Sequence, residues 1–352
     1  MFCNAVGKAI QKTIQKTTQK TIQVSAHRAV HLPHVVRRHL IAGAAVVVAW
    51  LPQSAAAQDW PTRTVTITQT FPGGGTMDFA ARMIAQELTE TLGQTFVVDT
   101  KIGGAGLLGL QTVSRMAPDG YSYVIGAVGP MVFRPLIDKN FNIDPDKDFE
   151  PIILIGATPN GVLVAPKIGV STVAELKAYA AKQGNKLNIG HPGPGTMGLY
   201  CGVLLAEKLG IEGNFISSRG SSQIVQDLAG GQLEAGTPAF GPNAMVAKVL
   251  AVSSDTRLAA FPDVPTLKQA GVDMTCATWT AIYAPAGTPK PIIAKLNRVI
   301  DVYLQKPETA KAFAAAGLTV WGGPPERVTK QMADDRKAWF AIIMRIENAN
   351  AK

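Results

Sequence analysis

Phe71–Asp78 reads FPGGGTMD and separates two segments of different periodicity. Before it, polar and apolar residues alternate over 64–68, which predicts a half-buried strand. After it, apolar residues recur at helical spacing over 79–92, which predicts an amphipathic helix capped by Thr76 or Asp78. Three glycines leave backbone N–H groups open to a ligand at a helix N-terminus, so the stretch predicts an anion site. The alternative is a tight turn that binds nothing.

A second loop repeats this arrangement. Residues 191–196 read HPGPGT, follow a predicted strand at 187–190 and precede a predicted helix at 198–209, with Thr196 placed to cap it. If the two loops belong to two domains, they can face each other and hold one anionic ligand from both sides. Closure about a hinge would then bury that ligand, as in a binding protein.

The N-terminal segment has the organisation of an export signal. Residues 1–39 carry seven basic and no acidic residues, and 40–51 form an apolar run that is short for a membrane span. Small residues at 54–57 then resemble a cleavage site, so 1–57 is expected to be a signal peptide rather than a membrane anchor. Arg37-Arg38 raises the possibility of twin-arginine export, but general secretion is the prediction because the usual flanking residues are missing. The expected location is the periplasm.

Charge and chemistry-bearing residues exclude several functions. The net charge of +9 falls to about +2 when the first 57 residues are removed, and no basic stripe remains for nucleic acid. The remainder holds one histidine, His191, and two cysteines, Cys201 and Cys276, without metal-ligand spacing. Neither a metal nor a cofactor is therefore expected. An exported protein can form a disulfide, but we expect two free buried thiols because the cysteines are far apart in sequence.

The remaining chain, about 295 residues, is long for one core and suits two domains. Strand-like and helix-like segments alternate along it, which predicts α/β layers around a largely parallel sheet. We expect domain 1 at 58–159 and 281–352 and domain 2 at 160–280. Trp279, beside the second crossover, is expected to be a packed hinge residue rather than a stacking platform.

Several motifs in order resemble one known family. They are FPGGGTMD, IGGAGLLGLQTVSRMAPDGYSYVIG, DFEPIILIGATPNGVLV, LNIGHPGPGTMG, DLAGGQLEAG, FPDVPTLKQAG and YAPAGTPKPIIAKLN. Together they resemble the Bug receptors, the periplasmic substrate-binding proteins of tripartite tricarboxylate transporters. The resemblance runs from Trp60 to about Ile346, and the combination of APDGY, PDVPT and APAGTP is specific.

The resemblance implies a two-domain, Venus-flytrap α/β fold with two crossovers. It also implies a receptor rather than an enzyme, which binds a small carboxylate through backbone amides of two loops, without metal or cofactor. The expected partners are membrane transporter subunits encoded elsewhere, and a monomer is expected. The implied ligand-binding residues are Gly73, Gly74, Gly75, Thr76, Met77, Asp78, Gly129, His191, Gly193, Gly195, Thr196, Met197 and Arg219.

This chain departs from the family pattern on ligand-facing loops. Residues 126–130 are more apolar than usual, Ser218–Ser221 replaces a common Tyr-Lys-Gly-Gly turn, and an acid is missing near Thr237. Because of these departures, the particular ligand of a relative cannot be assigned to this chain, although the class of ligand can. His191 could contact a distal carboxylate or lie at the rim, and Arg219 could clamp a second carboxylate or be solvated. Both alternatives stay open.

A nucleotide-dependent enzyme is the competing interpretation. Residues 104–109, GAGLLG, match a dinucleotide fingerprint. That motif should follow its strand at once, and an acid should end the next strand. Residues 100–102 intervene here, and the strand at 121–125 ends without an acid. The chain also lacks a P-loop lysine and a GxSxG nucleophile motif, so catalysis is not expected.

Overall fold

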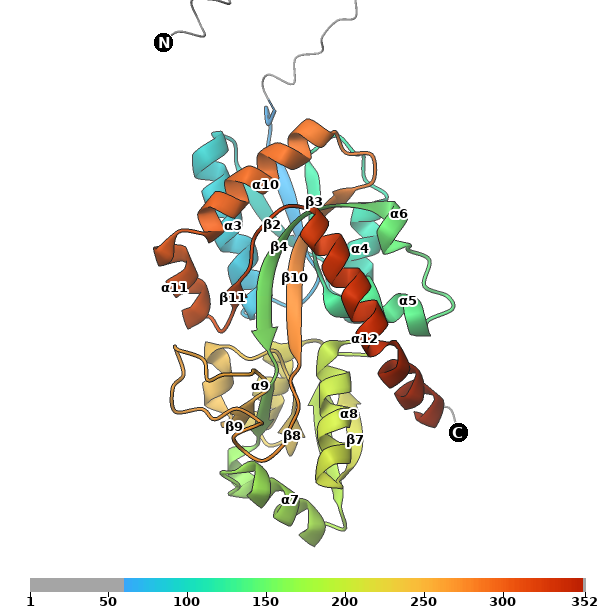
Figure 1. Ribbon diagram of the computed structural model, residues 1–352, viewed down its shortest axis with the longest axis vertical. Coiled ribbons are helices and arrows are strands. Elements are labelled where there is room, and N and C mark those ends of the chain that lie inside the picture. The colour runs from blue at the N-terminus through green and yellow to red at the C-terminus, as the bar shows by residue number, and fades with distance from the viewer. Residues whose placement is uncertain (1–59, 351–352) are drawn as a thin grey trace, which may run out of the picture. The chain divides into compact units, whose positions relative to one another are not determined.

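The computed structural model describes residues 60–350, so the signal peptide predicted at 1–57 lies outside the described residues. The first of two sheets has six strands in the order β11-β4-β10-β3-β1-β2. We call the elements around it lobe 1 (Figure 1). Its strands are β1 (Val65–Gln69), β2 (Phe96–Thr100), β3 (Ser122–Ala127), β4 (Phe149–Pro159), β10 (Ala277–Pro285) and β11 (Thr319–Val320).

Helices cover both faces of this sheet, because each face is apolar and must be buried. Ile67 of β1 packs with Ile84 and Leu296 on one face, and Leu110 packs with Met332 in the core of the other. The first face carries α3 (Thr76–Leu92), α10 (Lys290–Leu304) and α11 (Pro307–Ala315). The second carries α4 (Leu107–Ser114) and α12 (Glu326–Asn350), with short α5 (Arg134–Ile137) and α6 (Pro145–Asp148) nearby.

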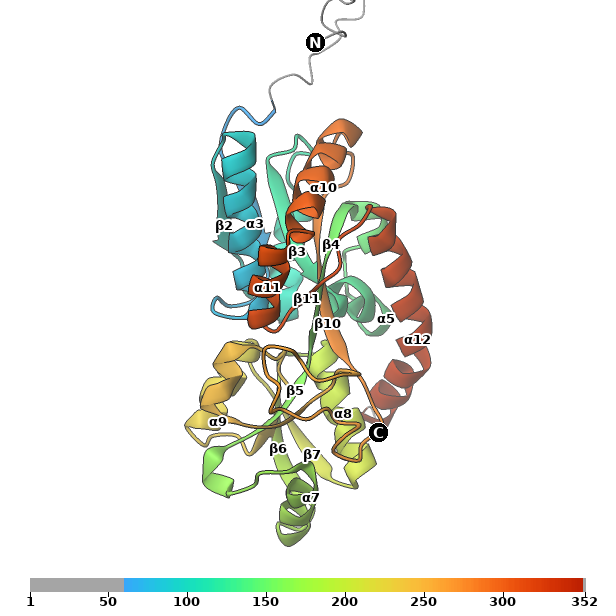
Figure 2. The ribbon, with the colours of Figure 1, turned by 60° about the vertical axis from the view of Figure 1, so that its left-hand side comes forward.

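The second sheet has five strands in the order β7-β6-β8-β5-β9 and forms the centre of lobe 2. Its strands are β5 (Gly161–Val164), β6 (Lys186–His191), β7 (Glu212–Ser217), β8 (Ala235–Gly236) and β9 (Lys248–Val252). Its helices are α7 (Val173–Lys182), α8 (Met197–Leu209) and α9 (Ser221–Ala229). The predicted α/β class is thus confirmed, and the strands form two separate sheets (Figures 1 and 2).

The expectation of a largely parallel sheet is wrong, because both sheets are mixed. In lobe 1, β1 pairs in parallel with β2 and β3, whereas β10 runs antiparallel to both β3 and β4. In lobe 2, β5 is antiparallel to β8 and β9. The reason is that β10 brings the chain back from lobe 2 and enters the first sheet in the opposite direction to the strands beside it.

The two crossovers lie side by side and are hydrogen-bonded to each other. Asn160 separates β4 from β5, is 1% exposed, and its side-chain amide donates to the Thr237 carbonyl at 2.9 Å. The Ser253 hydroxyl contacts the carbonyls of Asn160 at 2.8 Å and Cys276 at 2.5 Å. These contacts hold the outgoing and returning segments together at the point where the chain passes between the lobes.

A disulfide joins Cys201 and Cys276, with 6.2 Å between the two Cα atoms. The expectation of two free thiols is therefore wrong. Cys201 lies in the first half of α8, and Cys276 immediately precedes β10, so the fold brings together residues separated by 75 positions. The bridge ties a lobe 2 helix to the returning crossover.

The C-terminal helix also links the lobes. The Tyr200 hydroxyl of α8 donates to Glu347 of α12 at 3.0 Å, and Arg345 makes two contacts with Glu207, at 2.6 and 2.9 Å. Figure 2 shows α12 passing along the side of lobe 1 to α8. None of the helices within 60–350 is long and apolar enough to cross a membrane.

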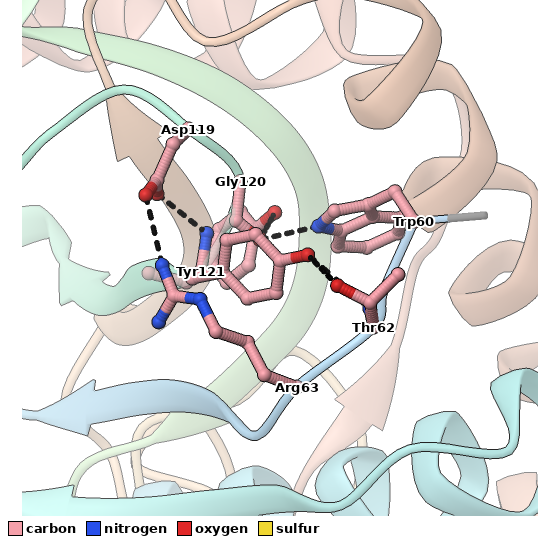
Figure 3. Close-up of polar contacts among 7 residues, drawn as sticks. Trp60, Thr62, Arg63, Asp119, Gly120 and Tyr121 are labelled. Atoms are coloured by element: carbon pink, nitrogen blue, oxygen red, sulfur yellow. Dashed lines mark hydrogen bonds and ion pairs between the residues drawn. The ribbon is translucent and has the colours of Figure 1, made fainter. Parts of the chain in front are cut away.

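The APDGY motif lies at the end of the first sheet where β1 begins, and its residues anchor that end (Figure 3). The Trp60 indole donates to the Gly120 carbonyl at 2.9 Å, and Arg63 pairs with Asp119 at 3.0 Å. The Arg63 guanidinium also stacks 3.7 Å from the centre of the Tyr121 ring. This cluster ties the start of β1 to the turn before β3, so the motif is structural. The glycine loop lies at the opposite end of β1.

Candidate functional site

A pocket lies between the lobes, where β1 and β3 end and three helices begin. The space within it is about 680 Å³, open solvent included. Its lobe 1 wall is made by Phe71, Pro72, Gly75, Thr76, Met77, Ala127, Gly129 and Pro130. Its lobe 2 wall is made by Pro192, Thr196, Met197, Gly198, Ser221, Ser222 and Ala239, and β10 contributes Thr278 and Thr280.

The lobe 1 loop presents the N-terminus of α3 to this pocket. Gly75 is the N-cap residue, with φ −96° and ψ 176°, and no side chain caps the helix at that position. The predicted caps, Thr76 and Asp78, are therefore wrong. Asp78 instead accepts the Gly74 N–H at 3.0 Å and pairs with Arg82 at 2.9 Å. The backbone N–H groups of the first turn have no partner inside the helix.

The lobe 2 loop presents the N-terminus of α8 in the same manner. Thr196 is its N-cap, as predicted, and its hydroxyl accepts the Leu199 N–H at 3.4 Å. The same hydroxyl donates to the Gly193 carbonyl at 2.7 Å, which fixes the loop. His191 is 5% exposed, and its Nδ1 accepts the Gly193 N–H at 3.2 Å. Burial lowers the pKa of His191, so the ring is neutral at neutral pH.

A third helix N-terminus, that of α9, completes the site. Ser221 and Ser222 open α9 and line the pocket. The Ser221 hydroxyl accepts the Ala239 N–H at 3.0 Å, which fixes the segment that follows β8. Sequence reasoning treated this turn mainly as a departure from the family pattern and missed both serines. The signal that could have found them is the Gly220 turn directly before an apolar helical repeat.

The two threonines of β10 were also missed. Thr278 and Thr280 alternate along the strand and therefore share one face, which lines the pocket. Trp279, between them, is 2% exposed and donates from its indole nitrogen to Asp335 of α12 at 2.5 Å. Trp279 is thus packed, as predicted. The order Thr278-Trp279-Thr280 is the sequence signal for the missed residues, because alternating polar and apolar residues indicate a strand with one face toward a polar site and the other toward the core.

The structure divides the sequence-predicted site residues into two groups. Those that line the pocket are Gly75, Thr76, Met77, Gly129, Thr196 and Met197. Those outside its lining are Gly73, Gly74, Asp78, His191, Gly193, Gly195 and Arg219. Arg219 is exposed, whereas His191, Gly193 and Gly195 are buried and support the loop behind the lining.

Several glycines allow the lobes to touch. A Cβ on Gly129 would lie 2.8 Å from the Gly195 carbonyl oxygen, and one on Gly193 would lie 2.8 Å from the Ala105 Cβ. The Ser222 hydroxyl lies 3.4 Å from the Gly73 carbonyl. The lobes therefore meet in this structure along both glycine loops.

The GAGLLG motif takes part in this packing. Ala105 has φ 54°, and Gly106 has φ 99°. A Cβ on Gly106 would lie 3.2 Å from Pro130 and 3.3 Å from the Phe71 ring, so the glycine lets this turn pack directly behind the pocket wall. The turn of this motif thus packs behind two lining residues, Phe71 and Pro130. On its lobe 2 side, Ala105 of the turn lies next to Gly193.

A family model and several solved structures resemble this chain. The family model described as tripartite tricarboxylate transporter family receptor matches residues 80–348. A solved R. palustris protein with adipate is 31% identical, covers 81% of this chain and 97% of its own, and has a TM-score of 0.77.

Two further solved structures cover 81% of this chain. The periplasmic binding protein BugD is 28% identical, with 98% of its own chain covered and a TM-score of 0.75. MatC from Rhodopseudomonas palustris with bound malate is 27% identical, with 100% covered and a TM-score of 0.74. The fold around the pocket is thus that of the periplasmic binding protein BugD and of the two proteins solved with adipate and malate.

Proposed function

Because this chain belongs to the tripartite tricarboxylate transporter receptor family, we propose that it captures a small carboxylate between its two lobes for uptake by a transporter of that type. The family is one of periplasmic solute receptors of the Bug type rather than of enzymes. The bound acids of the two R. palustris structures, adipate and malate, support a carboxylate as the ligand class.

The observation that carries the proposal is the convergence of α3, α8 and α9. Residues from the first turns of all three helices line one pocket. Each N-terminus offers backbone N–H groups and the positive end of a helix dipole, which favour a negative charge. We propose that these N–H groups bind the carboxylate.

Lobe closure belongs to the same proposal. Each lobe supplies part of the anion site, so the ligand stabilises the form in which the two glycine loops approach each other. The hydrogen-bonded crossovers at Asn160 and Cys276 are the proposed hinge. We further propose periplasmic export through the 1–57 segment, membrane subunits as partners, a monomeric receptor, and the domain boundaries given above.

A thermal-shift screen against small carboxylates, with NAD as the comparison ligand, tests the proposal. A ligand at about 100 times its Kd stabilises the native state by about 2.7 kcal/mol, which raises the melting temperature measurably. We expect one or more carboxylates, and not NAD, to produce this shift. A shift with NAD alone would favour the nucleotide interpretation of GAGLLG instead.

A further inference from the structure

Two side chains of lobe 2 reach across to the backbone of the lobe 1 glycine loop. Asn243 lies in the short 3₁₀ turn Pro242–Val246, and its side-chain amide donates to the Gly74 carbonyl at 3.4 Å. Ser222 lies in the first turn of α9, and its hydroxyl donates to the Gly73 carbonyl at 3.4 Å. The two side chains also meet, because the Asn243 amide lies 3.5 Å from the Ser222 hydroxyl. An amide has two hydrogens, so it can serve both acceptors.

The glycine loop needs partners outside itself to fix its conformation. Gly73, Gly74 and Gly75 follow one another, and glycine rotates more freely about φ and ψ than any other residue. Gly74 has φ 82°, in the left-handed region. Its N–H donates to Asp78 at 3.0 Å within lobe 1. Asp78 and Ser222 therefore hold the same peptide group from opposite sides, one from each lobe.

The next peptide group, between Gly74 and Gly75, is held on its carbonyl side by Asn243. Within the described part of the chain, the Gly75 N–H donates to no backbone acceptor, and no side chain caps the helix there. In a planar trans peptide the N–H and the carbonyl point in opposite directions. Gly75 lines the pocket and Asn243 does not. With its carbonyl held toward Asn243, this peptide group therefore turns the Gly75 N–H toward the pocket.

We infer that Asn243 is a positioning residue for the ligand site, and that Asn243 and Ser222 together form a latch between the lobes. When the lobes close, the latch fixes the glycine loop so that the Gly75 N–H faces the carboxylate. The inference rests on the proposed carboxylate function and deepens it. Because these contacts cross between the lobes, they exist in the closed form alone and favour it. A donor that is already oriented also lowers the entropic cost of binding.

Asn243→Ala tests the latch, because Asn243 lies outside the pocket lining and its truncation removes no lining atom. Ser222 lines the pocket, so its substitution would also change the wall. The probe is the acid that gives the largest shift in the thermal-shift screen, in which adipate and malate are included. We expect titration calorimetry to show about three- to tenfold weaker binding, as for loss of a hydrogen bond between neutral groups.

Kinetics separate a latch from a merely structural role. The latch forms after the acid has entered, so stopped-flow measurements should show faster dissociation of the acid and an unchanged association rate. The ligand-free melting temperature should stay unchanged. A lower melting temperature with an unchanged dissociation rate would mean that Asn243 only stabilises its own turn, and would overturn the inference.

Asn214→Ala is the matched control. The Asn214 amide donates to Asn188 at 2.7 Å, so its hydrogen bond stays within lobe 2, and it lies outside the pocket lining. We expect its affinity for the same acid to equal that of the parent. Equal affinity in Asn243→Ala, or an equal loss in both variants, overturns the latch and leaves the proposed function intact. If no acid in the screen shifts the parent, the proposed function fails and the latch fails with it.

Discussion

Gly129→Ala should separate lobe closure from folding. Gly129 begins the π-helical turn that follows β3, and a Cβ there would lie 2.8 Å from the Gly195 carbonyl oxygen and 3.1 Å from the Thr196 Cα. Both atoms belong to the backbone of lobe 2, so the lobes must move apart by several tenths of an ångström. Overpacking of this kind typically costs about 1–3 kcal/mol.

That cost falls on the closed form alone, because the contact is absent when the lobes separate. The Kd for the preferred carboxylate should therefore rise by about fivefold to 150-fold. The ligand-free protein should be as stable as the parent or slightly more so, since alanine lowers the entropy of the unfolded chain wherever its conformation is compatible with the fold. Titration calorimetry and thermal unfolding measure the two effects separately.

Gly210→Ala is the matched control for this variant. Gly210 ends α8 with φ 68°, where alanine is strained, but a Cβ there would meet no atom within 4 Å. We expect lower stability and unchanged affinity, which is the opposite pattern. Unchanged affinity in Gly129→Ala would refute the reasoning, because the Gly129–Gly195 contact would then not belong to the bound state.

Four other outcomes are expected. Gly75→Val should weaken carboxylate binding at least tenfold in calorimetry while the protein stays folded. The reason is that the valine side chain would enter the space between the N-termini of α3 and α9. Unchanged affinity would contradict the role of the glycine loops in binding. The pKa of His191 is lowered by burial, so the parent should lose stability as the pH falls below about 6.5, where the unfolded histidine binds a proton. His191→Gln should show a smaller loss between pH 7.5 and 5.5 by urea unfolding, and equal slopes would show that other groups dominate. Cys201→Ala should lower the free energy of unfolding by about 2–4 kcal/mol, whereas an unchanged urea midpoint would mean that the Cys201–Cys276 bridge contributes little. Small-angle scattering should give a smaller radius of gyration with saturating ligand, and identical profiles alongside proven binding would indicate a preformed site.

Local sequence patterns predicted the elements that present the two glycine loops. The strand before Phe71–Asp78 and the helix after it agree with β1 and α3 to within a few residues. The same is true of β6, the Thr196 cap and α8. Periodicity and capping act over one or two turns of chain, so they are readable without any knowledge of tertiary contacts.

Local patterns failed where one side chain had several possible partners. Thr76 and Asp78 both suited a cap, but the carboxylate of Asp78 reaches back to the Gly74 N–H and leaves Gly75 as the N-cap. His191 was open to the rim or the ligand, and the structure buries it against the Gly193 N–H. Such choices depend on the exact course of each loop.

The sequence by itself determined the α/β class, the two glycine loops and the helix N-termini behind them, because these follow from short-range periodicity, glycine content and capping. Only the tertiary structure decided which distant residues share the site. The returning strand β10 carries Thr278 and Thr280 beside a loop about 200 positions earlier, and it brings Cys276 to Cys201. The physical reason is that the chain crosses twice between lobes, and the position of a crossover strand depends on long-range packing that leaves no periodic trace in sequence.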